Sequence, residues 1–103
     1  MLEKYTIAIK STQRVADNAL SIEFDLPWMM DNLSPFIDHV LNACGITVVN
    51  EVILGADLHC VRFTYKEDVF LLQFEEYSQS SWIESETPGG EAHLMTLESL
   101  LVQ

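Results

Sequence analysis

Residues 58–77 read LHCVRFTYKEDVFLLQFEEY, and this stretch carries the strongest structural signal in the chain. Apolar and polar residues alternate from Leu58 to Lys66 and again from Val69 to Tyr77, which is the two-residue period of half-buried strands. Glu67-Asp68 lies between the two runs and is expected to form the turn of an antiparallel hairpin. In the predicted register three apolar pairs face each other, namely Tyr65 with Phe70, Phe63 with Leu72, and Val61 with Phe74.

Upstream of this hairpin, the pattern predicts two strands and a helix. Tyr5–Lys10 alternates between apolar and polar residues, residues 11–20 are mixed and polar, and Ile22–Leu26 alternates again. We therefore expect two paired strands joined by a connection over residues 11–20. A helix over about 35–44 follows, because its apolar residues recur at three- and four-residue steps and Gly45 suits the position after a helix end.

The remaining elements complete an α+β pattern. Ile46–Leu54 is an apolar strand, Trp82–Glu84 predicts a short strand, and the breaker Pro88-Gly89-Gly90 precedes a helix over Leu94–Leu101. This order predicts an antiparallel sheet of five to six strands with two helices packed on one face. No repeat or shift in composition divides the chain, so residues 1–103 are expected to form a single domain.

The charge balance of the chain is strongly acidic. Sixteen acids and five bases give a net charge of −11 over 103 residues, and no base follows Lys66. Eight acids do follow it, which are Glu67, Asp68, Glu75, Glu76, Glu84, Glu86, Glu91 and Glu98. Such a field repels nucleic-acid phosphates and attracts a basic protein partner. The alternative is that these acids only keep a small protein soluble.

The chain shows no targeting signal, so we expect a cytoplasmic protein. No stretch has the roughly 20 uncharged apolar residues that a membrane-spanning helix needs, and the N-terminus lacks the apolar run of a signal peptide. Cys44 and Cys60 are too far apart for a redox or zinc pair and lie in apolar patterns. We therefore expect two buried free thiols.

The predicted register gathers ionisable side chains at one end of the hairpin. It places His59 opposite Glu76 and Cys60 opposite Glu75, so His59, Glu75 and Glu76 are the candidate catalytic residues. A histidine beside a carboxylate can act as a general base or bind a metal. One histidine and one glutamate fall short of the three protein ligands of a zinc site, so no metal site and no cofactor are expected. The alternative is a cross-strand ion pair at the edge of the sheet.

A second candidate site follows the hairpin. Tyr77, Trp82 and Glu84 lie in the densest polar and aromatic stretch of the chain, and aromatic side chains are favoured at protein interfaces. These residues are therefore candidates for partner binding. The alternative is that the two aromatic residues belong to strands and pack in the core.

Three short motifs carry a resemblance to a known family. They are Gly55-Ala56-Asp57-Leu58-His59, Phe74-Glu75-Glu76-Tyr77-Ser78 and Trp82-Ile83-Glu84. The chain resembles a family of bacterial proteins of roughly 100 residues whose function is unknown. The resemblance implies a bacterial cytosolic origin, implies no activity and assigns no functional residue.

Two function classes are consistent with the sequence. The first is a small acidic protein-interaction domain that binds a basic partner. The second is a small enzyme or metal-dependent binder centred on His59, Glu75 and Glu76. The second site is incomplete, so we expect a binding protein rather than an enzyme. The strand over Ile46–Ile53 is apolar on both of its faces, which also predicts a homodimer that covers it.

Overall fold

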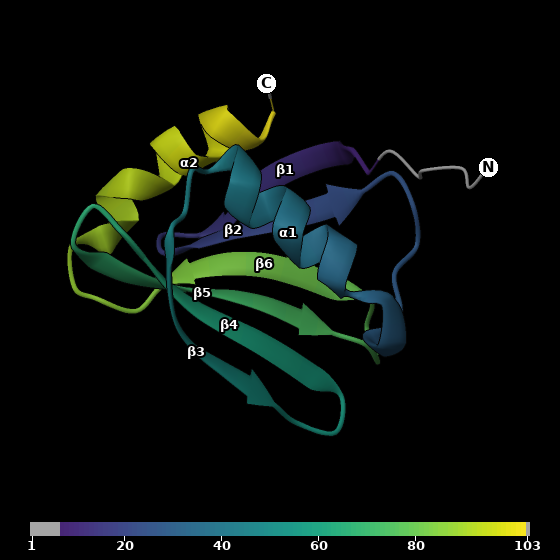
Figure 1. The fold of residues 1–103 in the computed structure, drawn as a ribbon. Coiled ribbons are helices and arrows are strands. Elements are labelled where there is room, and N and C mark those ends of the chain that lie inside the picture. Colours follow the sequence, from purple (N-terminus) through teal and green to yellow (C-terminus); the bar gives the residue numbers. More distant parts are fainter. Residues whose placement is uncertain (1–6, 103) are drawn as a thin grey trace.

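The structure is a computed structural model that describes residues 7–102 (Figure 1). Six strands, two α-helices and two single-turn 3₁₀ helices follow one another along the chain. In chain order they are β1 (Ile9–Ala16), β2 (Ala19–Phe24), η1 (Met30–Asn32), α1 (Ser34–Ala43), β3 (Val48–Leu54), β4 (Leu58–Tyr65), β5 (Asp68–Glu75), β6 (Ser80–Ser85), η2 (Gly90–His93) and α2 (Leu94–Leu101).

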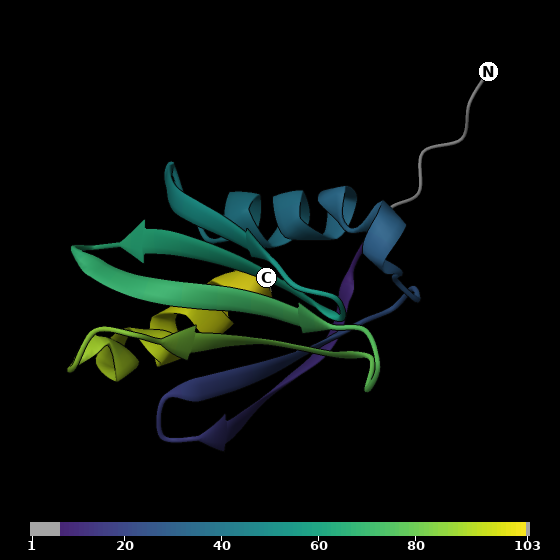
Figure 2. The same ribbon diagram turned by 90° about the horizontal axis from the view of Figure 1, so that it is seen from below.

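The strands form one antiparallel sheet in the order β1-β2-β6-β5-β4-β3. The connection from β2 to β3 contains α1, and β6 returns to the centre of the sheet, between β2 and β5. Both helices contribute to one hydrophobic core on one face of this sheet. In Figure 1, α1 lies in front of the sheet and α2 lies near β1 and β2, while Figure 2 shows the twist of the strands. The predicted α+β fold is therefore confirmed.

The core is built from the apolar face of the inner strands and the inner faces of the two helices. Ten side chains are the most completely buried, and they are Phe63, Phe70, Phe74, Leu20, Leu72, Ile83, Leu94, Leu97, Val40 and Val61. Burial of each large apolar side chain contributes roughly 1.5–3 kcal/mol relative to an exposed one. β4 and β5 supply members of this group at every second position, which confirms the predicted alternation of their apolar residues, and α2 supplies Leu94 and Leu97.

The predicted register of the central hairpin is wrong by two residues. Tyr65 lies opposite Asp68, Phe63 opposite Phe70, and His59 opposite Phe74. The turn is Lys66-Glu67 instead of Glu67-Asp68, and both turn residues have positive φ angles, of 49° and 74°. Positive φ at both central positions is the type I′ geometry, whose twist matches that of the flanking strands. A shift of two residues leaves every side chain on its predicted face and changes only its cross-strand neighbour.

The expected connection over residues 11–20 is also wrong, because most of it is strand. β1 runs from Ile9 to Ala16, and β2 begins at Ala19 after a two-residue turn. β1 is an edge strand whose polar side chains are mostly exposed, so it lacks the apolar alternation by which half-buried strands are detected. Tyr5 and Thr6 of the expected first strand lie outside the described residues.

Two predictions from the sequence concern the cysteines and the absence of a membrane-spanning helix. Cys44 and Cys60 are buried and free, as predicted, and burial raises the pKa of the Cys44 thiol to about 12. Within residues 7–102, no helix has the length and apolar character needed to span a bilayer. The expected cytoplasmic location stays a prediction.

The Lys66-Glu67 turn gives a direct test of the register. The double substitution K66N/E67G introduces the residues that type I′ turns favour, so the left-handed conformation no longer strains two side chains. We expect the free energy of unfolding to rise by about 1 kcal/mol, measured by urea denaturation. The same Asn-Gly pair placed at Glu67-Asp68 (E67N/D68G) is the control and is expected to destabilise the protein, since it removes the Asp68 side chain from its pairing with His93. Equal effects of the two double substitutions would contradict the observed turn.

Candidate functional site

His59 lies in a hollow between α1 and the β3–β4 edge of the sheet. The hollow has a volume of about 420 Å³, and its lining residues are Met30, Asp31, Leu33, Ser34, Ile37, Asp38, Val52 and His59. His59 is half-buried there, and burial lowers the pKa of its imidazole below the ordinary value of 6.5. The imidazole is therefore neutral at neutral pH and adds a weakly polar surface to a largely apolar floor.

Glu75 is bound to the β5–β6 turn. Its carboxylate accepts hydrogen bonds from the backbone N–H groups of Tyr77, at 2.8 Å, and Ser78, at 3.0 Å, and from the Ser78 hydroxyl. The hydrogen bond from the Ser78 side chain is the main reason that the pKa of Glu75 is lowered. Glu75 therefore fixes the conformation of a turn, which is a structural use of a carboxylate.

Glu76 connects the same turn to the segment that precedes α1. Its Oε2 accepts a hydrogen bond of 3.0 Å from the backbone N–H of Met30, and its own N–H donates to the Asp57 carbonyl at 2.8 Å. Met30 lines the hollow that contains His59. Glu76 thus holds one wall of the hollow in place and is not the cross-strand partner of His59.

The predicted cluster of His59, Glu75 and Glu76 is not formed as the sequence suggested. The observed register pairs His59 with Phe74 and Cys60 with Gln73, because the turn lies one residue earlier than expected. Within residues 7–102, no group of three or more His, Cys, Asp or Glu side chains has the arrangement of a metal site. His59 is thus not the cross-strand neighbour of Glu76, and the enzyme or metal-binding alternative stays a prediction.

Trp82 and Glu84 lie together on the face of the sheet opposite the helices. Glu84 Oε1 accepts hydrogen bonds from Trp82 Nε1, at 2.7 Å, and from Gln73 Nε2, at 2.6 Å. Tyr77 lies apart from this pair, in the β5–β6 turn, with 91% of its surface exposed. The structure thus brings together two of the three predicted partner-binding residues, and their binding role stays a prediction.

Most of the eight C-terminal acids are engaged by groups of the same chain. All of them except Glu67 accept hydrogen bonds from, or pair with, groups of the same chain. These bonds join Asp68 to His93, Glu75 to Ser78, Glu76 to Met30, Glu84 to Trp82, Glu86 to Arg62, Glu91 to Gly89, and Glu98 to Thr12. The acidic face expected to bind a basic partner stays a prediction.

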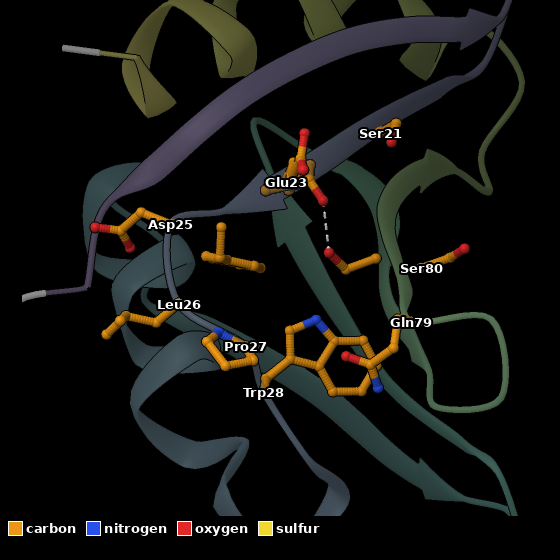
Figure 3. A pocket seen from close by; sticks show the side chains of 11 residues that line it. Ser21, Glu23, Asp25, Leu26, Pro27, Trp28, Gln79 and Ser80 are labelled. Carbon is orange, nitrogen blue, oxygen red and sulfur yellow. Dashed lines mark hydrogen bonds between the residues drawn. The ribbon is translucent and has the colours of Figure 1, made fainter.

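A second hollow, of about 400 Å³, lies where β2 ends (Figure 3). Glu23 and Asp25 lie on one side of it, and Gln79 and Ser80 lie on the other, with the Trp28 indole between them. Both carboxylates are already engaged, because Glu23 pairs with Lys10 at 3.8 Å and Asp25 accepts a hydrogen bond of 3.0 Å from the Ala8 N–H. This hollow is therefore a weaker candidate for ligand binding than the one at His59.

The most unusual surface of the molecule is β3, which lies at the edge of the sheet. Val48, Val49, Val52, Ile53 and Leu54 are between 41% and 69% exposed. Val52 also lines the hollow at His59, so the strand and the hollow form one continuous surface. Sequence reasoning did not name this surface as a site. The available signal was the presence of apolar residues on both faces of the strand, from which we predicted only a homodimer.

The environment of His59 predicts a pH dependence of stability. The pKa of His59 is lower in the folded state than in the unfolded chain, so the unfolded state binds more protons just below pH 6.5. Stability is therefore expected to fall as the pH decreases from 6.5 to the folded-state pKa. NMR titration of the His59 ring should give a value below 6.5, and H59Q should remove this part of the pH dependence while H39Q leaves it. A ring pKa at or above 6.5 would show that the hollow does not exclude water from His59.

The comparison with protein families covers almost the whole chain. Residues 7–102 match the model of a family described as "Protein of unknown function (DUF3630)", which confirms the resemblance to a family without known function. No curated protein and no solved structure is significantly similar to the chain. Because the match includes every described strand and helix, this chain belongs to the DUF3630 family.

Proposed function

We propose that this chain is a protein-interaction domain that binds a basic partner at the edge of its sheet. The binding surface, which we call the β3 edge, comprises the strand Val48–Leu54 and the hollow between this strand and α1. The single observation that carries the proposal is the row of exposed apolar side chains on β3. Contiguous apolar surface of this kind marks binding sites in proteins that are otherwise well packed.

The open face of the sheet, opposite the helices, gives less support to a binding role. Its side chains satisfy one another, because Arg62 pairs with Glu51 and Glu86, and Glu84 accepts hydrogen bonds from Trp82 and Gln73. A partner would have to replace these hydrogen bonds, whereas Val49, Val52 and Leu54 of the β3 edge offer apolar surface from which a partner displaces water. Exposed apolar side chains are therefore concentrated at the β3 edge.

The charges around the β3 edge support a basic partner. Asp31 and Asp38 line the hollow, and neither carboxylate takes part in an ion pair or hydrogen bond with another described residue. The nearest base on the adjoining strand is Arg62, which is neutralised by Glu51 and Glu86. Lys or Arg side chains of a partner would gain attraction to both aspartates, on top of the general attraction to a chain of net charge −11.

A pull-down with matched charge variants tests this proposal. D31N/D38N removes two charges from the rim of the hollow, and D17N/E67Q removes two charges from distant turns. We expect the first variant to lose most of the retained partner and the second to retain it, as measured by quantitative mass spectrometry. For the wild type, retention should fall as the salt concentration rises, because added salt screens exposed charges.

The outcome that contradicts a basic partner is equally clear. If both double variants retain the same proteins in the same amounts, the rim of the hollow has no role in binding. Retention that does not change between low and moderate salt would remove the electrostatic part of the proposal.

A further inference from the structure

The two edges of the sheet are protected very differently. The outer strand β1 carries Lys10 and Arg14, and its register is irregular near both ends. Charged side chains and irregularities are devices by which edge strands avoid pairing with other chains. β3 has one register shift and a single charged residue, Glu51, which is neutralised by Arg62. β1 therefore has more of the features that block the addition of another strand than β3 has.

The hydrogen-bond pattern shows which backbone groups of β3 point away from the sheet. The N–H of Gly55 donates to the Leu58 carbonyl at 2.6 Å, which fixes the alternation of the β3–β4 ladder. Bonded and non-bonded pairs alternate in an antiparallel ladder, so Ile53 and Glu51 bond to β4. The N–H and C=O groups of Val52 and Leu54 therefore point outward, and no described residue pairs with them.

The outward backbone groups and the hollow belong to the same stretch of β3. Val52 presents its N–H and C=O to the outside, and its side chain lines the hollow with Met30, Ile37 and His59. Side chains of an added strand would lie beside those of Val52 and Leu54, because paired residues share a face of the sheet. One of them would thus be directed into the hollow.

We propose that the outer edge of β3 receives an extended segment of the partner as an additional strand, with one apolar side chain of that segment seated in the hollow at His59. This inference rests on the proposed function and specifies the chemistry of the partner. The segment alternates apolar and basic residues, and its backbone pairs with Val52 and Leu54. Its apolar side chains lie on the side of the hollow, and its Lys or Arg side chains lie on the open side of the sheet, where Glu51 of β3 lies. Strand addition of this kind obtains affinity from the backbone and specificity from pockets for alternate side chains.

The charge of the β3 edge favours a basic segment over a second copy of this chain. A two-fold interface between two β3 strands would add a second pair of Asp31 and Asp38 carboxylates to the same edge. Each copy also carries a net charge of −11. Like charges at an interface oppose association, whereas a basic segment is attracted to the negatively charged chain.

Two synthetic peptides of identical composition test the proposal on the full chain. In the first peptide, leucine and lysine alternate; in the second, the leucines and the lysines are grouped in separate blocks. Both peptides have the same charge, so only the first can direct leucines to one side of an added strand. We expect the alternating peptide to bind about tenfold more tightly and to slow hydrogen exchange of the Val52 and Leu54 amides about tenfold. The amides of β1 should be unaffected.

A pair of valine substitutions provides the matched protein control. Val52 in β3 and Val15 in β1 are 51% and 57% exposed, and each lies in an edge strand. V52K places an ammonium group at the hollow, and a charged side chain on an edge strand opposes the addition of another strand. We expect V52K to weaken binding of the alternating peptide about tenfold. V15K adds the same charge at the opposite edge and is expected to leave binding unchanged. Thermal unfolding of both variants verifies that they fold.

The outcomes separate this inference from the proposed function. If D31N/D38N loses the cellular partner while the β3 amides stay unprotected by the alternating peptide, strand addition is wrong and the interaction domain survives. Equal binding of the two peptides, or of V52K and V15K, would also overturn strand addition. Sedimentation that shows a dimer of the free protein, with the β3 amides already protected, would assign the edge to a second copy instead.

Discussion

The aromatic contacts of Phe74 determine where the first helix lies on the sheet. Phe74, in β5, stacks on Phe24 of β2 with ring centroids 6.1 Å apart, and the Trp28 indole meets it edge-on at 5.3 Å. Phe24 in turn contacts Phe36 of α1 at 5.1 Å. These rings anchor α1 over the middle of the sheet. Six strands span about 24 Å, while two helices side by side cover about 20 Å. With α2 bound to β1 through the Thr12–Glu98 hydrogen bond, β3 is the strand left uncovered.

Burial patterns were predictable from the sequence because each side chain follows the local period of its element. Alternation in residues 58–77 correctly predicted that Phe63, Phe70 and Phe74 share one face, and this conclusion is insensitive to a shift of two residues. The cross-strand neighbours were not predictable, because they depend on where the chain turns. Lys66 and Glu67 adopt left-handed conformations without glycine or asparagine, so nothing in their chemistry marks them as turn residues.

The predicted pairing of His59 with Glu76 was wrong for the same reason, because it depended on where the chain turns. A carboxylate can be located on a strand from its sequence position, but its hydrogen-bond partner is set by loops. Glu76 binds Met30, which is 46 positions away in the chain, and Glu75 is used by its own turn. Most of β1 could not be predicted from the sequence either, because its residues are mostly polar and exposed and show no apolar alternation. The exposed apolar character of β3 was visible in the sequence, but its position at the edge became clear only from the sheet order.

The exposed apolar edge strand β3 and the high negative charge of the chain are physically related. A strand such as β3, with its unpaired backbone groups and apolar side chains, would pair with other copies in a protein of low net charge. The net charge of −11 on every copy opposes such pairing. That protection acts only against acidic partners. A basic segment experiences an attractive field instead, which favours its approach to β3. On the proposed function, the acidic residues of the chain thus select basic partners for β3.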